Sequence, residues 1–239
     1  MKKKLLALAL ALSMLTGLAA CGSETAAKDS PEPPESVEPS ATVSVEAPAP
    51  SNGAGDTEEL KYESGSMTGG VYRNEFLGIG CTLDESWTYY SDGEIASLNG
   101  IDTASMSDEE IAELLHSSSV IYDMYAMAES GLVTMNIVFE NLCVLYDPEL
   151  DTAGYVDIAI SNLGDALTSA GYSDVSCEKA TVDFCGEERY AIDITGVLSN
   201  MTIYEKLIYI KQGNYIAVIT LASFGADITA DLAALFHTL

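Results

Sequence analysis

Apolar and polar side chains alternate along much of the chain after residue 70, as they do in half-buried β-strands. Residues 132–140 show this pattern most clearly. Their apolar positions are Val133, Met135, Ile137 and Phe139, and the polar positions between them are Thr134, Asn136 and Glu140. A strand here is predicted to direct Ile137 and Phe139 into a core. The same register directs Asn136 and Glu140 toward solvent.

Other segments of the same kind predict further strands. These are two short strands within 70–90, one at 120–127, and up to four at 175–184, 189–197, 201–211 and 215–222. Turn-forming residues separate the last four strands, namely Gly186, Ser199 with Asn200, and residues 212–214. The second half of the chain is therefore predicted to be continuous β-structure.

Apolar residues at helical spacing predict three helices. The first begins after Ser107, whose hydroxyl can cap it while Glu110 completes a capping box. The second covers roughly 152–170 and ends at Gly171. The third is C-terminal, with an apolar stripe of Ile228, Leu232, Leu235, Phe236 and Leu239. Grouped strands with helices at intervals predict an α+β fold, a largely antiparallel sheet with helices packed on it.

The first 21 residues predict where the protein is located. Three lysines precede an apolar run from Leu5 to Leu15, and small residues precede Cys21. The run is too short to cross a hydrocarbon layer of ~30 Å as a helix, and it has the proportions of a secretory signal. The segment resembles a bacterial lipoprotein signal that ends in a lipobox. The alternative is an ordinary signal peptide with a cysteine nearby.

The lipoprotein resemblance implies three things about the mature protein. Residues 1–20 are a signal peptide removed by cleavage, and Cys21 carries the lipid, including palmitate, as the new N-terminus. The protein is then held at the extracytoplasmic face of the cell membrane by that anchor.

Residues 21–70 follow as the lipidated cysteine and a tether. Six of the seven prolines lie between residues 31 and 50, among Ser, Thr, Ala and Glu. Because such a segment has little apolar surface to bury, it cannot offset the entropy lost on ordering. We expect a disordered acidic tether here. Residues 71–239 have the length of one ordinary domain and are predicted to form a single α+β unit.

Charge restricts the partners of this chain. Asp and Glu number 37 against 10 Lys and Arg, for a formal net charge of −27. Nucleic-acid binding depends on basic side chains that neutralise phosphates, so nucleic acid is excluded as a partner. Electrostatic binding to anionic lipid, in addition to the lipid anchor, is also disfavoured. The acids can attract cations or basic partners, or they can form a solvated coat.

Two stretches resemble the PsbP-like family of α/β/α sandwich domains, found in photosynthetic accessory proteins and many bacterial lipoproteins. They are YRNEFLGIGCTLDESW at 72–87 and VDFCGEERYAIDITGV at 182–197, the latter followed by two long strands. The family often has proline shortly before the tryptophan, where this chain has residues 84–86, Asp-Glu-Ser. The family shares no catalytic set, so the resemblance implies a scaffold for binding or assembly.

The motifs of catalysis are absent from the sequence. It contains no G-x-S-x-G, H-E-x-x-H, Walker-type or paired C-x-x-C motif. His116 and His237 lie near the ends of predicted helices, where a histidine stabilises the terminal carbonyls. Trp87, Tyr89 and Tyr90 can contact a sugar-like ligand, or they can pack as a core tryptophan with tyrosines at the sheet rim.

Two further groups of side chains have candidate chemistry. Asp102, Asp108, Glu109, Glu110 and Glu113 form an acidic cluster that is a weak candidate for a cation site. Consecutive acids at a helix start also stabilise the helix dipole, and this interpretation is favoured over metal. Besides Cys21, the cysteines are Cys81, Cys143, Cys177 and Cys185. Three pairings are possible, although their apolar contexts slightly favour free thiols. No metal or other cofactor is predicted.

Two functions remain open. The first is a non-catalytic surface lipoprotein whose sheet face or helix–sheet cleft binds a peptide, a glycan or a partner protein. The second is an envelope hydrolase that uses a carboxylate pair or a thiol in that cleft. The absence of a nucleophile–base motif favours the first.

Overall fold

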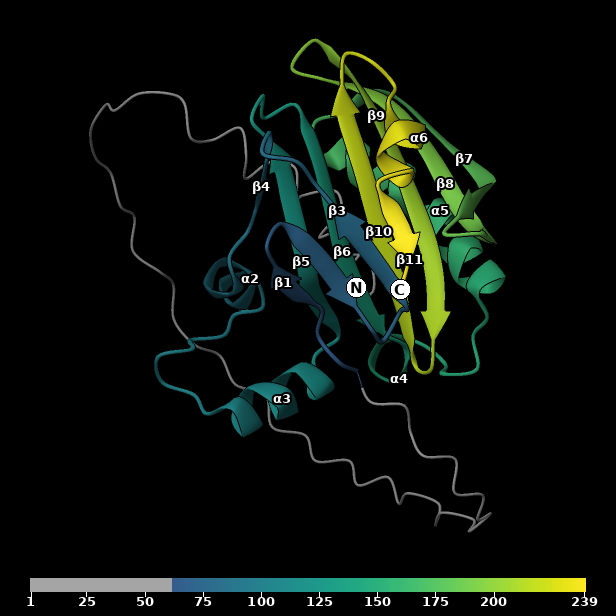
Figure 1. Cartoon of the computed structure of the whole chain (residues 1–239). Helices are drawn as coiled ribbons and strands as arrows, with labels where there is room; N and C mark the ends of the chain where they lie inside the picture. The colour runs from purple at the N-terminus through teal and green to yellow at the C-terminus, as the bar shows by residue number, and fades with distance from the viewer. Residues whose placement is uncertain (1–61) are drawn as a thin grey trace, which may run out of the picture.

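The computed structural model describes residues 62–239. The predicted signal peptide, Cys21 and nearly all of the predicted tether lie outside the described residues. A seven-stranded antiparallel sheet forms the centre of the fold, and a four-stranded antiparallel sheet packs on one of its faces (Figure 1). With helices packed on the sheets, the fold is of the α+β class, as predicted.

The large sheet contains all of the long strands. Its order is β4 (Trp87–Tyr89), β5 (Val120–Ala128), β6 (Val133–Asn141), β10 (Tyr215–Phe224), β9 (Met201–Gln212), β8 (Glu187–Leu198) and β7 (Ser173–Phe184). The six longer strands confirm those predicted from alternation. The turn between β8 and β9 holds Ser199 and Asn200 at φ of 51° and 64°, a left-handed conformation that asparagine tolerates.

The small sheet combines the two ends of the described chain. Its order is β1 (Ser66–Thr68), β2 (Val71–Asn74), β3 (Ile79–Thr82) and β11 (Phe236–Thr238). The segment 70–90 therefore holds three strands where two were predicted, because β4 leaves the small sheet and pairs with β5 in the large one.

The predicted C-terminal helix is wrong. Only α6 (Thr229–Ala233) is helical, and the chain then extends into β11, which pairs with β3. The stripe is compatible with a helix, but the edge of β3 supplies backbone partners that a helix would leave unused. Phe236 lies opposite Cys81, and its ring packs on Phe184 with the centroids 5.1 Å apart.

The helix α5 (Thr152–Ser169) covers the opposite face of the large sheet, as its apolar spacing predicted. Asp151 caps its first turn by accepting a hydrogen bond from the Gly154 amide. Its side chains Tyr155, Val156 and Leu167 are buried against the sheet. The predicted helix after Ser107 is also present as α3 (Asp108–Ser117). Two short helices were not predicted, α2 (Asp92–Leu98) and α4 (Leu142–Leu145).

The predicted exposure of Asn136 and Glu140 is wrong, although the predicted inward face of β6 is confirmed. Ile137 and Phe139 belong to the core between the two sheets. Asn136 and Glu140 are 0% and 2% exposed. An alternating pattern normally indicates that one face of the strand is exposed to water. Here β6 is an inner strand whose second face is also covered, so its polar side chains are buried too.

Candidate ligand-binding cavity

A cavity of about 350 Å³ lies at one corner of the fold, between α2, α3, strand β5 and the segment 64–67. This is the kind of helix–sheet cleft in which the sequence predicts ligand binding. Figure 1 shows α2 and α3 beside the β1 and β5 end of the two sheets, away from α5.

Local sequence signals build the two helices of this corner. Ser91 begins α2 and Ser107 begins α3, and each hydroxyl accepts a hydrogen bond from the amide three residues later. Glu94 and Glu110 complete the two capping boxes by accepting from the Ser91 and Ser107 amides at 2.8 Å. Such a box satisfies amides that a helix start otherwise leaves unpaired.

These helices present their apolar sides to the cavity rather than to a closed core. Ile95 and Ala96 of α2, with Ile111 and Leu115 of α3, line it. No described side chain of α2, and none among residues 109–117 of α3, is fully buried. Apolar side chains usually become buried when an amphipathic helix packs on a sheet. Here the stripes are only partly covered.

One hydrogen-bonded pair fixes α2 to the sheet. Asn99, the residue after α2, donates from Nδ2 to the Tyr122 carbonyl and accepts at Oδ1 from the Tyr122 amide, both at 2.7 Å. The next strand residue, Asp123, lies at an irregularity in the pairing of β5 with β6. A bulge of this kind re-aims a side chain out of the strand's regular alternation.

Asp123 forms the polar floor of the cavity. Its carboxylate accepts hydrogen bonds from the hydroxyls of Tyr62 and Tyr72, from Asn74 Nδ2 at 3.0 Å, and from the Gly65 amide at 2.9 Å. The Asp123 residue as a whole is 9% exposed. Burial and the neighbouring Asp123 charge raise the pKa of both tyrosine hydroxyls above the ordinary range, so both remain protonated donors.

This arrangement allows little space beside the carboxylate. A Cβ atom at Gly65 would lie 2.4 Å from Tyr72 Cε2 and 2.7 Å from Asp123 Oδ2, so the position requires glycine. Both carboxylate oxygens already accept hydrogen bonds from protein groups. Asp123 therefore ties the first described residues and the small sheet to β5, and is poorly placed to act as a general base.

The three aromatic residues predicted to contact ligand do not gather at one place. Trp87 and Tyr89 are partly buried against the core between the two sheets. The Tyr89 hydroxyl donates to the Cys81 carbonyl at 3.1 Å. Tyr90 alone lines the cavity, where its ring lies 4.5 Å from that of Tyr125 between centroids.

The acidic cluster is dispersed over a turn and the start of α3. Asp102 accepts from the Ala104 amide, and Glu110 accepts from Ser107 as the capping partner. Glu109 and Glu113 are exposed on α3, which Asp108 begins. Across residues 62–239 the structure shows no group of three or more His, Cys, Asp or Glu side chains able to hold a metal ion.

The histidines and cysteines are also separate from the cavity. His116 lies in the last turn of α3, and its ring Nδ1 is 3.4 Å from the Tyr215 hydroxyl. His237 is exposed on β11 rather than at a helix end. Cys81, Cys143, Cys177 and Cys185 are free thiols in the structure. Burial raises the pKa of Cys81 and of Cys185 to about 11, which disfavours the nucleophilic thiolate.

Two other carboxylates are buried, and they are not paired with each other. Glu140 on β6 and Glu205 on β9 face the α5 side of the sheet, and burial raises the pKa of each to about 7. Ile216 on β10 pairs with Glu140 on β6 on one side and with Lys211 on β9 on the other. Lys211 is six residues from Glu205 along β9. At about 3.3 Å per strand residue, the backbone positions of the two glutamates are offset by roughly 20 Å along the strands. This distance is too long for a carboxylate pair acting on one bond.

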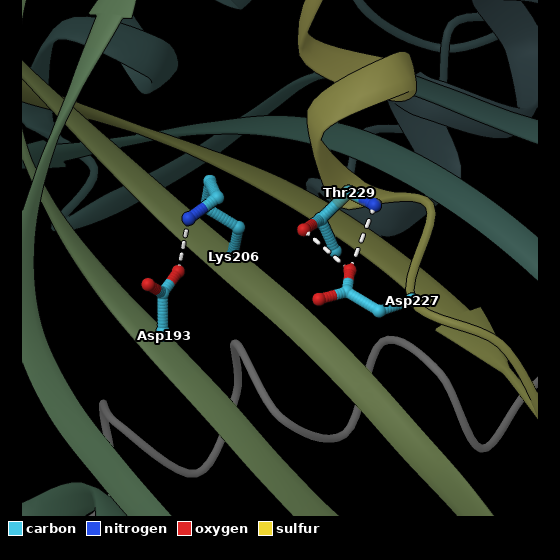
Figure 2. Close-up of polar contacts among 4 residues, drawn as sticks. All are labelled: Asp193, Lys206, Asp227 and Thr229. Carbon is cyan, nitrogen blue, oxygen red and sulfur yellow. Dashed lines mark hydrogen bonds and ion pairs between the residues drawn. The ribbon is translucent and has the colours of Figure 1, made fainter.

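A further polar group lies near α6 and is structural. Lys206 on β9 forms an ion pair with Asp193, its cross-strand neighbour on β8 (Figure 2). Asp227 accepts hydrogen bonds from the amide and hydroxyl of Thr229 at 3.0 and 2.8 Å, which shapes the turn into α6. Each carboxylate in this group therefore has a local structural partner.

The sequence interpretation predicted a helix–sheet cleft but did not identify Asp123 or its donors, although one signal for Asp123 was present. Asp123 is the only charged residue in the predicted strand 120–127, VIYDMYAM. A lone acid in an apolar strand requires donors from elsewhere in the fold. Its donors come from residues about 50 to 60 positions earlier, and no local pattern identifies them.

No protein-family model matches the chain, and no curated protein matches it either. Among solved structures, it is similar to LpqN, involved in cell envelope biogenesis of Mycobacterium tuberculosis. The two are 9% identical over 67% of this chain and 83% of LpqN, with a TM-score of 0.36. It is also similar to PA94, a Pseudomonas aeruginosa protein of unknown function and putative regulator. That match is 14% identical over 42% of this chain and 66% of PA94, with a TM-score of 0.28.

TM-scores below 0.5 do not establish a shared fold, and neither neighbour assigns a function to this chain. The PsbP-like resemblance likewise remains a prediction. Within residues 62–239, the structure shows no helix that is long and apolar enough to cross a membrane.

Proposed function

We propose that this protein is a non-catalytic lipoprotein of the cell envelope whose α+β domain binds a ligand in the cavity between α2, α3 and β5. The observation that carries the proposal is a cavity of about 350 Å³ beneath two capped helices that bury no described side chain fully. Pockets of this size, largely apolar with a few placed polar groups, are typical of small-ligand sites.

The chemistry of the cavity supports binding over catalysis. Hydrolysis by an acid needs a carboxylate that can exchange a proton with substrate. Asp123 accepts hydrogen bonds from four protein groups, and its tyrosine neighbours hold their protons tightly. None of the cavity-lining residues that the structure describes is a cysteine or a histidine. An envelope hydrolase remains the alternative function.

A ligand screen distinguishes the two functions. Residues 22–239, which keep both hydrophobic clusters, are tested by thermal shift against ions, sugars and peptides, and in parallel against a panel of hydrolase substrates. A ligand that binds the folded state raises the unfolding temperature by an amount that grows with the ratio of its free concentration to its Kd. We expect a stabilising ligand and no turnover. Turnover that a single Asp, Glu or Cys substitution abolishes would favour the hydrolase.

The envelope location is tested at Cys21. We propose that Cys21 bears the lipid and that residues 22–61 link it to the domain, so the membrane is contacted through the anchor only. Cys21→Ala is expected to release the protein from the membrane fraction or to leave an unprocessed precursor. Cys143→Ala, at an exposed thiol of the domain, is the matched control and should leave the protein membrane-bound. A Cys21→Ala protein that is processed and retained like the wild type would contradict the anchor.

A further inference from the structure

Two of the polar groups on the cavity wall, Asp123 and Asn99, are already paired with protein atoms. Asp123 accepts from Tyr72 and three other groups, and Asn99 both donates to and accepts from the Tyr122 backbone. A polar ligand would have to compete with these internal hydrogen bonds. Leaving a buried polar group unpaired costs more free energy than a new hydrogen bond usually returns. Asp123 and Asn99 therefore offer little to a ligand rich in hydroxyls.

Most of the remaining wall is apolar and comes from three elements and a loop. The side chains that matter are Ile95 on α2, Ile101 in the loop after α2, Ile111 and Leu115 on α3, and Ile121 and Met124 on β5. Ile121 and Met124 are fully buried, whereas Ile95, Ile111 and Leu115 are only partly covered. An apolar ligand would remove the remaining surface of these side chains from water, which favours binding in proportion to the area buried.

Charge at the cavity has one sign. Asp92 and Asp123 line it, and no Lys, Arg or His occurs among the lining residues that the structure describes. The whole chain is strongly acidic as well. An anionic group would enter without a cation to pair with, and an unpaired charge removed from water is strongly disfavoured.

Cavity volume limits the size of the ligand. An apolar cavity of about 150 Å³ accommodates benzene. The cavity here is about 350 Å³, which on the same scale is room for about fourteen carbon atoms, so an aliphatic chain of about ten carbons fits inside it.

We propose that the cavity binds an uncharged or cationic aliphatic group of about ten carbons, with the hydrocarbon between α2, α3 and β5. This proposal rests on the function proposed above and adds the ligand class. It predicts a ligand chemistry unlike that of a glycan, since the side chains on α2, α3 and β5 that would contact the ligand are largely aliphatic, and Asp123 and Asn99 are internally paired.

The test compares three probes that share one chain and differ in head-group charge, namely decan-1-ol, decylammonium and decanoate. Each is titrated below its micelle-forming concentration into residues 22–239, with thermal shift and calorimetry as readouts. We expect decan-1-ol and decylammonium to bind with one site and to raise the unfolding temperature. Decanoate is expected to bind at least tenfold more weakly.

Two variants locate the binding site. Ala96→Phe places a ring in the cavity and should weaken decan-1-ol binding at least tenfold, while Ala112→Phe, the same change at an exposed position of α3, should not. Ile111→Gln keeps the side-chain size but makes the wall polar, and it should also weaken binding tenfold. This second variant keeps the test valid if Ala96→Phe fails to fold.

Each contrary result has a distinct meaning. Failure of both decan-1-ol and decylammonium to bind, or binding unchanged in Ala96→Phe and Ile111→Gln, overturns the aliphatic ligand. A disaccharide or peptide that binds instead, and loses affinity in Ala96→Phe, overturns the ligand class but leaves the cavity as the binding site. If no compound of either screen binds, the proposed function fails together with the ligand class.

Discussion

The α5 side of the molecule and the α2–α3 corner use amphipathic helices in opposite ways. On the α5 side, Tyr155, Val156 and Leu167 are buried against β8, β9 and their neighbours, and the helix completes a core. At the corner, two helices with complete capping boxes bury no described side chain fully and enclose a cavity instead. The same local pattern therefore supports stability in one region and an open site in the other.

The difference has a physical origin in what faces each helix. Beneath α5, apolar side chains of the large sheet, such as Ile192 and Leu207, fill the space. Beneath α2 and α3, the sheet presents the Asp123 cluster, and the helices are held at their ends by Asn99 and by their caps. A void lined by apolar atoms forgoes dispersion contacts, so this corner contributes less to stability than α5 does.

The largest expected effect comes from the polar group that holds the corner in place. Asp123→Ala removes the acceptor of two hydroxyls, an amide side chain and a backbone amide, all of which lie in poorly hydrated positions. We expect the free energy of unfolding to fall by about 4–5 kcal/mol, as for loss of a buried hydrogen-bonding network. Urea unfolding measures it. Asp92→Ala, at the exposed start of α2, is the control and should change it by under about 1 kcal/mol. A loss below about 1 kcal/mol for Asp123→Ala would mean that the cluster does not hold the corner.

A matched pair of leucine substitutions tests the comparison itself. Leu167 of α5 is 0% exposed, whereas Leu115 of α3 lines the cavity and is only partly covered. Leu167→Ala should cost about 3–4 kcal/mol by loss of burial and cavity formation. Leu115→Ala should cost less, about 1–2 kcal/mol in the ligand-free protein, because Leu115 is only partly covered although it also packs against the core between the two sheets. Equal costs in urea unfolding would show that the two regions are packed alike.

The α5 side carries a pH dependence that the corner is not expected to share. Burial raises the pKa of Glu140 to about 7, above the ordinary value of 4.5. Unfolding therefore releases a proton between these two values, and stability is lost as pH rises from about 4.5 to 7. The share of one such group is up to about 3 kcal/mol.

Glu140→Gln removes that share. The variant should match the wild type at pH 4 and exceed its free energy of unfolding by about 2–3 kcal/mol at pH 8, measured by urea unfolding at both values. Glu113→Gln, at an exposed carboxyl of α3, serves as control and should leave the pH dependence unchanged. A Glu140→Gln protein whose advantage is the same at pH 4 and pH 8 would contradict the assigned protonation.

The smallest expected effect is at the caps. Ser107→Ala removes the hydroxyl that accepts from the Glu110 amide, and should destabilise α3 by about 1 kcal/mol. Faster amide hydrogen exchange in residues 108–117 would report it, with exchange in α5 unchanged. Ser117→Ala, at the other end of α3, should have little effect. Loss of protection throughout α5 would show that the two helices unfold as one unit.

Sequence patterns predicted those parts of the fold that depend on neighbouring residues. The strands β5 to β10 follow from period-two alternation, α5 from helical spacing, and α3 from the Ser107 and Glu110 pair. The C-terminal stripe led to a wrong prediction because residues 228–239 satisfy helical spacing without forming a helix. The partner that decides their conformation, the edge of β3, is about 155 residues away along the chain.

The candidate site was less accessible to sequence interpretation, since its parts come from separate regions of the chain. Tyr62, Tyr72 and Asn74 reach Asp123 only when the small sheet packs on the large one. The aromatic prediction illustrates the same limit. Trp87 and Tyr89 are three positions and one position before Tyr90, yet they lie against the core while Tyr90 lines the cavity.

The sequence by itself determined the α+β class, most strand and helix positions, the acidic character of the chain and the expectation of a lipid-anchored envelope protein. These depend on composition and on periods of two or 3.6 residues, which act over a few positions. Only the tertiary structure decided which faces are buried, that Phe236 joins a strand, and that α2 and α3 enclose a cavity above Asp123. Packing of residues distant in sequence sets these features, because burial depends on what covers a side chain as much as on the side chain itself.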